Sequence, residues 1–197
     1  MSVEVNLPNR LTLHRFLISV SFLFCLVNYD RINWLMAALC LFVAAGVTDI
    51  YDGLLARRYD EETDFGRFMD PLADKLITMI AFVYFIQIPE LRWPAWLVIC
   101  LVARELAVNS LRTLGANRDK VLSSTTSGKY KTAVQMCGIG LVLLGLVFFR
   151  LGWVAREWLE GVSWTTMFLV LILTIYSGFE YYWRNWPMLW LSSLHSS

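Results

Sequence analysis

The chain has 197 residues, of which 57% are hydrophobic, and its formal net charge is +1. This apolar fraction, with a mean hydropathy of +0.54, exceeds the roughly 45–50% that is usual in soluble domains, so we expect a polytopic membrane protein. The net charge does not indicate a class of partner, and no basic tail suggests a nucleic-acid partner. Four cysteines without a CxxC pair argue against a disulfide framework or a zinc site.

Six apolar segments predict an all-α fold with six transmembrane helices. In chain order they span residues 10–28, 34–58, 68–88, 93–113, 128–149 and 161–182. A span needs about 20 residues, and the second, third and fourth segments reach this length only if charged residues are taken into one end. We expect one membrane domain over residues 1–197, with a short interfacial arm at 1–9 and a tail of unassigned role at 185–197.

The basic residues predict the orientation of these spans. Thirteen of the 17 lysines and arginines fall on one side, and the other four are Arg31, Arg92, Arg150 and Arg156. Because basic residues concentrate in cytoplasmic loops, both termini are predicted to be cytoplasmic. The charged ends of the second, third and fourth helices then meet at the cytoplasmic leaflet, where charges inside a membrane mark function.

The stretch TDIYDGLLARRYDEETDFGRFMDPLADK (48–75) carries four aspartates between the second and third helices. Asp49 and Asp52 are three residues apart and Asp70 and Asp74 four apart, so each pair shares one helix face. A short connection predicts that the two helices are antiparallel neighbours with all four carboxylates facing one small volume. Such carboxylates repel one another and either protonate or bind cations. Oxygen ligands suit Mg²⁺, Mn²⁺ or Ca²⁺, and four carboxylates are enough for two ions.

Small residues and one arginine accompany the aspartates. Gly53 lies within a helix at a cost of about 1 kcal/mol in helix propensity, and its missing side chain lets a ligand approach the backbone. Ala56 and Gly66 continue this pattern, and Arg57 supplies a cation suited to a phosphate. A simpler interpretation makes Asp70 only an N-cap, which leaves the other aspartates unexplained.

The run Asp49-x2-Asp52-Gly53-x2-Ala56-Arg57-x8-Gly66-x3-Asp70-x3-Asp74 resembles the complete signature of the CDP-alcohol phosphatidyltransferases, a family with a six-helix membrane fold. The resemblance implies that the first three aspartates bind two Mg²⁺ or Mn²⁺ ions with help from Asp74, which is also the general base. It further implies that the enzyme is a homodimer. The residues that it assigns to the CDP moiety are Gly53, Ala56, Arg57 and Gly66.

Basic residues outside the signature bear on the acceptor alcohol. Arg104 and Arg112 are about two turns apart on one face of the fourth helix, and Lys129 and Lys131 open the fifth. Four cations near the carboxylates suit an anionic acceptor such as glycerol 3-phosphate, whose phosphate needs charge-assisted hydrogen bonds. The alternatives are that the lysines only obey the positive-inside rule, and that Glu105 or another acid neutralises Arg104.

Four further segments are similar to the bacterial phosphatidylglycerophosphate synthase branch of this family: NRLTLHR (9–15), ARELAVNSLR (103–112), GKYKTAVQ (128–135) and YSGFEYY (176–182). The resemblance implies transfer of a phosphatidyl group from CDP-diacylglycerol to the 1-hydroxyl of sn-glycerol 3-phosphate, giving phosphatidylglycerol phosphate and CMP. It implies a multi-pass protein of the bacterial cytoplasmic (inner) membrane, in contact with membrane lipids, whose active site faces the cytoplasm. The sequence offers no covalent nucleophile with an activating base, so we expect a metal-assisted direct displacement.

Two alternatives stay open at this point. Cardiolipin synthases of the CDP-alcohol type use phosphatidylglycerol as acceptor and carry a similar GKxxTxxQ segment. A divalent-cation transporter also places carboxylates inside a membrane, although here the acids gather at one leaflet and the outer halves of the helices offer no polar relay.

Overall fold

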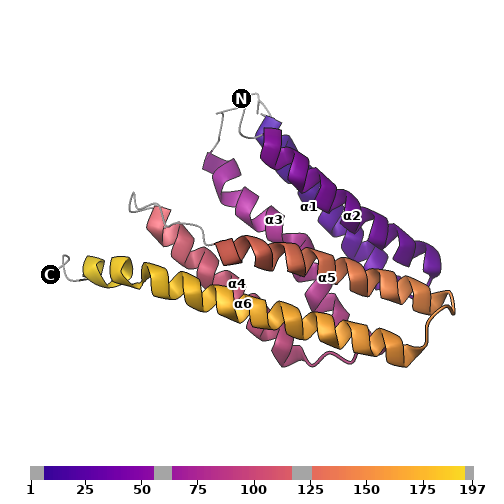
Figure 1. The fold of residues 1–197 in the computed structure, drawn as a ribbon. Coiled ribbons are helices and arrows are strands. Elements are labelled where there is room, and N and C mark those ends of the chain that lie inside the picture. The colour runs from indigo at the N-terminus through magenta and orange to yellow at the C-terminus, as the bar shows by residue number, and fades with distance from the viewer. Residues whose placement is uncertain (1–6, 56–63, 117–125, 194–197) are drawn as a thin grey trace.

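The computed structural model describes the backbone of residues 7–55, 64–116 and 126–193, and the side chains of residues 13–48, 75–111, 127–128 and 130–185. This part of the chain is all-α, which confirms the prediction of a helical fold (Figure 1). The helices are α1 (Leu7–Val27), α2 (Ile32–Leu55), α3 (Asp64–Phe85), α4 (Ala95–Ala116), α5 (Thr126–Arg150) and α6 (Arg156–Ser193).

The first and last helices extend beyond their predicted ends. α1 begins at Leu7, inside the segment expected to be an interfacial arm, with Pro8 in the first turn, where a missing backbone N–H has no intrahelical partner to lose. α6 contains 38 residues, a length of about 57 Å at the standard rise. Residues 185–193 of the tail are therefore helical and continue α6.

The packing order of the helices differs from the expectation at one point. α1 packs against both α2 and α3, whereas α2 and α3 make little contact with each other in the described residues. Apolar packing holds α1 against α2, since the ring centroids of Phe22 in α1 and Phe42 in α2 lie 5.8 Å apart in the core. The prediction that these two helices are direct neighbours is wrong over this part, although their aspartate-bearing ends lie at the same end of the bundle (Figure 1).

Apolar side chains cover much of the outside of the bundle. Ile99, Ile172 and Phe179 are each more than 60% exposed, and extended apolar surfaces of this kind mark contact with lipid or protein. By length and composition, two helical segments of the described chain can cross a membrane, Tyr130–Arg150 and Arg156–Asn185. Shorter apolar stretches lie in α1, α2 and α3.

At the end of the bundle opposite the aspartates, Arg150 contacts two connecting segments. Arg150, the last residue of α5, donates from Nη2 to Asp30 Oδ1 at 3.0 Å and to Glu90 Oε1 at 3.2 Å. Its guanidinium carbon lies 5.1 Å from the centroid of the Tyr29 ring. Burial, with the nearby Glu90 and Asp30 carboxylates, raises the pKa of Tyr29, so the ring stays neutral. These contacts join the α1–α2 and α3–α4 connections to α5.

Replacing Arg150 with methionine tests whether its contacts with Asp30 and Glu90 stabilise the fold. Arg150→Met removes both hydrogen bonds and leaves the mostly buried Glu90 carboxylate without them. We expect a melting temperature in detergent lower by about 2–4 °C, which corresponds to roughly 1 kcal/mol in a chain of this size. Arg31→Met is the matched control, because Arg31 is exposed at the same end and its side chain makes no ion pair with any described residue. Equal decreases in the melting temperatures of the two variants would show that the Arg150 contacts do not stabilise the fold.

Candidate functional site

The four signature aspartates lie in helices. Asp49 and Asp52 are in the last two turns of α2, and Asp70 and Asp74 are in the first three turns of α3. Because α3 already begins at Asp64, Asp70 lies in its second turn, and the interpretation of Asp70 as an N-cap is wrong. The side chains of these four aspartates lie outside the described residues, so their joint coordination of a metal stays a prediction.

The other signature positions are divided between described and undescribed segments. Gly53 lies in α2 and Gly66 in the first turn of α3, while Ala56 and Arg57 fall outside the described residues. Among the side chains that the structure describes, no three histidines, cysteines, aspartates or glutamates gather as a metal site. Because the side chains around these signature positions lie outside the described residues, the predicted CDP contacts stay untested.

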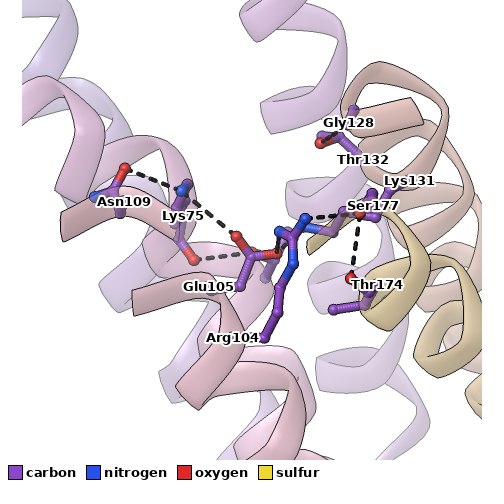
Figure 2. A network of polar contacts seen from close by, with 10 residues as sticks. Lys75, Arg104, Glu105, Asn109, Gly128, Lys131, Thr132, Thr174 and Ser177 are labelled. Carbon is purple, nitrogen blue, oxygen red and sulfur yellow. Dashed lines mark hydrogen bonds and ion pairs between the residues drawn. The ribbon is translucent and has the colours of Figure 1, made fainter. Parts of the chain in front are cut away.

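A buried carboxylate forms the centre of a polar cluster beside α3. Glu105 in α4 is 7% exposed, and Lys131 in α5 is 5% exposed. Lys131 Nζ forms an ion pair with Glu105 Oε1, and Lys75 Nζ of α3 lies 3.5 Å from Glu105 Oε2 (Figure 2). A buried charge is tolerated when it is paired and hydrogen-bonded, so this one carboxylate joins three helices.

Arg104 brings a fourth helix into the cluster. Its Nη1 lies 3.8 Å from Glu105 Oε1, and its Nη2 donates a hydrogen bond to Ser177 Oγ in α6 at 2.7 Å. Ser177 Oγ in turn donates to the backbone carbonyl of Thr174 at 3.2 Å (Figure 2). The guanidinium is therefore oriented by contacts on two sides.

A glycine in α6 makes room for this arginine. A Cβ atom placed on Gly178 would lie 2.8 Å from Arg104 Nε and 3.2 Å from Arg104 Cγ. Both distances are shorter than ordinary van der Waals contact, so any larger residue would displace the arginine. Gly178 thus lets the Arg104 side chain lie directly against α6.

The cluster also adjoins the aspartate positions along the chain. Lys75 directly follows Asp74 in α3, and its Nζ donates to Asn109 Oδ1 in α4 at 3.2 Å. With the Glu105 contact, this hydrogen bond fastens α4 to the turn of α3 that carries Asp74 (Figure 2). The cationic groups and the predicted metal ligands therefore belong to neighbouring parts of one end of the bundle.

The structure brings together only part of the predicted acceptor site. Arg104 and Lys131 share the Glu105 carboxylate, so Glu105 does pair with Arg104, as one alternative held. Arg112 lies two turns further along α4, and Lys129 lies in the first two turns of α5. Neither of these two side chains is described, and phosphate binding by the four residues stays a prediction.

Three members of the cluster were not assigned a role from the sequence: Lys75, Asn109 and Ser177. Adjacency to Asp74 was a signal for Lys75. No sequence signal pairs Ser177 with Arg104, because that contact joins residues 73 positions apart.

Comparison with known proteins identifies the family of the chain. The sequence model of the CDP-alcohol phosphatidyltransferase family matches residues 5–177. The chain belongs to this family. The matched range contains all four signature aspartates together with Lys75, Arg104, Glu105 and Lys131. The match confirms the resemblance to this family seen in the sequence.

Individual relatives align over nearly the whole chain. A Bacillus subtilis (strain 168) protein is 34% identical over 197 residues, which covers 93% of this chain and 97% of the relative. Proteins from Escherichia coli (strain K12) and Shigella flexneri are each 35% identical over 182 residues, covering 91% of this chain and 94% of the relative. All three relatives are named CDP-diacylglycerol–glycerol-3-phosphate 3-phosphatidyltransferase.

Adding a methyl group at Gly178 tests the packing of Arg104. Gly178→Ala gains about 1 kcal/mol of helix propensity but breaks a hydrogen bond to a charged group worth about 1.5–3 kcal/mol. We expect the melting temperature to fall by about 2–4 °C.

The matched control is Gly161→Ala, also in α6, where an added Cβ meets nothing within 4 Å. This control should raise the melting temperature, because only the propensity term applies. A similar increase in both variants would show that Arg104 does not lie against Gly178.

Proposed function

We propose that the chain transfers the phosphatidyl group of CDP-diacylglycerol to the 1-hydroxyl of sn-glycerol 3-phosphate, giving phosphatidylglycerol phosphate and CMP. The observation that carries this proposal is the cluster of Lys75, Arg104 and Lys131 next to the turn of α3 that bears Asp74. The names of relatives that align over more than 90% of the chain support the same reaction.

The acceptor phosphate belongs at Lys131 and Arg104. A lysine ammonium has three N–H donors and an arginine guanidinium five, so each can contact Glu105 and still donate to another anion. Both groups are largely buried, with side-chain exposures of 6% and 16%. Charge-assisted hydrogen bonds to phosphate are strongest in such surroundings. Arg112, near the C-terminal end of α4, and Lys129, near the N-terminal end of α5, complete the proposed phosphate site.

The position of this cluster also suits the reacting hydroxyl. In sn-glycerol 3-phosphate the phosphate and the 1-hydroxyl are at opposite ends of a three-carbon chain. Lys75 contacts the cluster and directly follows Asp74. A phosphate held by α4 and α5 therefore leaves the hydroxyl to point toward α3 and Asp74.

The four aspartates supply the donor side of the proposed site. Asp49, Asp52, Asp70 and Asp74 fit two Mg²⁺ or Mn²⁺ ions, because carboxylate oxygens are the ligands these ions prefer and the aspartate-bearing ends of α2 and α3 lie at one end of the bundle (Figure 1). When bound, such ions neutralise charge on the diphosphate and on the departing CMP. Gly53, Ala56, Arg57 and Gly66 hold the CDP moiety in this proposal.

The chemical step is a direct displacement. Asp74 accepts the proton of the acceptor 1-hydroxyl as general base. The hydroxyl oxygen forms a bond to the phosphorus that bears diacylglycerol, while the bond from that phosphorus to the CMP oxygen breaks. Lys131 and Arg104 hold the phosphate at the other end of the acceptor during this step.

The proposed setting is the bacterial cytoplasmic membrane. All six helices cross it, both termini are cytoplasmic, and the protein forms a homodimer. The apolar outer surface and the two long apolar segments support membrane crossing. The distribution of the 17 basic residues supports the orientation.

An acceptor screen tests the proposed reaction. Purified protein is given labelled CDP-diacylglycerol and Mg²⁺ in detergent, with glycerol 3-phosphate, phosphatidylglycerol, serine or inositol. Of the four acceptors, we expect only glycerol 3-phosphate to give rapid CMP release. CMP release should stop when EDTA removes the metal. Preference for phosphatidylglycerol would show a cardiolipin synthase instead. No CMP release with any acceptor would favour the transporter alternative.

Removing the Lys131 ammonium tests the acceptor site. Lys131→Ala should raise the KM for glycerol 3-phosphate by about tenfold or more and change the KM for CDP-diacylglycerol by less than about twofold. Arg184→Ala is the control, because Arg184 is exposed at the same end of the bundle and contributes only general positive charge. Equal increases in both KM values for Lys131→Ala would contradict a specific phosphate contact.

A further inference from the structure

Glu105 places a negative charge inside a site that is proposed to bind a phosphate. Its carboxylate is buried among the cations that are proposed to bind a phosphate, so its charge repels the acceptor. If the cluster only needed positive charge, an acid at its centre would weaken it. The geometry therefore calls for a separate role for this residue.

We propose that Glu105 is a positioning residue that holds Lys131 and Arg104 in the arrangement that receives the acceptor phosphate. This inference rests on the proposed function and adds a residue to its acceptor site. Glu105 contacts the ammonium of Lys131 and lies 3.8 Å from Arg104 Nη1, so both cations are oriented from the same side (Figure 2).

The contacts of Glu105 divide its two oxygens between helices. Oε1 faces Lys131 of α5 and Arg104 of α4, while Oε2 lies 3.5 Å from Lys75 of α3. The carboxylate is a shared partner of all three cations, which arrive from three helices. Few other side chains of this size can satisfy three such contacts, because a carboxylate accepts up to about four hydrogen bonds.

Repulsion and side-chain freedom give the physical reason for this role. Three like charges brought together in surroundings of low dielectric repel one another, and lysine and arginine side chains have many rotamers. Without the Glu105 carboxylate, repulsion between the three cations favours rotamers that separate them. Glu105 holds them together before the acceptor arrives, so acceptor binding no longer requires that ordering.

Positioning and simple neutralisation predict opposite changes in the KM for glycerol 3-phosphate when Glu105 is replaced. If Glu105 only offsets charge, replacing it by glutamine makes the site more positive and lowers the KM for glycerol 3-phosphate. If Glu105 positions the cations, the same replacement disperses them and raises that KM. Glutamine keeps the shape of the side chain, so the comparison isolates the carboxylate charge.

The experiment measures steady-state kinetics of the full-length protein in detergent with both substrates varied. We expect Glu105→Gln to raise the KM for glycerol 3-phosphate by about tenfold, with the KM for CDP-diacylglycerol within about twofold of wild type. At saturating glycerol 3-phosphate, kcat should return to within about threefold of wild type. The control is Glu160→Gln at the other end of the bundle. It weakens the ion pair between Glu160 Oε1 and Arg92 Nη1, which are 3.4 Å apart, and should leave both KM values unchanged.

A second variant decides the question if Glu105→Gln does not fold. Glu105→Asp keeps the charge but withdraws the carboxylate by one methylene, so positioning predicts an acceptor KM raised by about threefold and neutralisation predicts no change. A lowered or unchanged acceptor KM in Glu105→Gln, or an unchanged one in Glu105→Asp, overturns the proposal. Wild-type protein that releases no CMP with glycerol 3-phosphate overturns the proposed function itself, and this inference with it. Active wild type with unaffected variants overturns the inference alone.

Discussion

A carboxylate that is 7% exposed inside a helical bundle must be paired with cations, and Glu105 meets this constraint with side chains from three helices. Satisfying it fixes α4 against α3 and α5. It also places Arg104 against α6, where Ser177 accepts its hydrogen bond and Gly178 leaves space for it. The helices that surround the candidate site are thus joined by polar contacts rather than by apolar packing alone.

The two ends of the bundle are built differently. At one end Arg150 joins connecting segments through Asp30 and Glu90, so that two carboxylates share one cation. At the other end Glu105 gathers three cations next to the aspartate-bearing turn of α3. The first arrangement can only stabilise the fold, whereas the second also concentrates groups that bind phosphate. This asymmetry explains why all proposed chemistry lies at one end.

Much of the fold could be predicted from the sequence. Long apolar runs identified six helices, because a helix that faces apolar surroundings has no need of polar residues. The aspartate spacing identified the family, because a metal site fixes ligand positions along a helix. Helix ends were harder to place: α6 continues to Ser193 although its last turns contain Arg184, Asn185 and Pro187. Hydropathy falls there and Pro187 cannot donate a backbone hydrogen bond, yet the helix continues to Ser193.

The contacts of the cluster could be predicted only in part. Glu105 beside Arg104 was visible as a possible neutralising pair. Its contacts with Lys75 and Lys131 depend on how α3, α4 and α5 pack, and residue spacing carries no information on that packing. The same reason explains why α1 lies against both α2 and α3, where a short connection had favoured direct contact between α2 and α3.

The central claim is that the cations gathered by Glu105 receive the acceptor phosphate. An experimental structure of the protein with glycerol 3-phosphate and a non-reactive CDP-diacylglycerol analogue bound tests this claim most directly. The account predicts phosphate density within hydrogen-bonding distance of Lys131 Nζ and the Arg104 guanidinium, with the 1-hydroxyl directed toward Asp74. A phosphate bound elsewhere, with Lys131 and Arg104 contacting only Glu105, would contradict it.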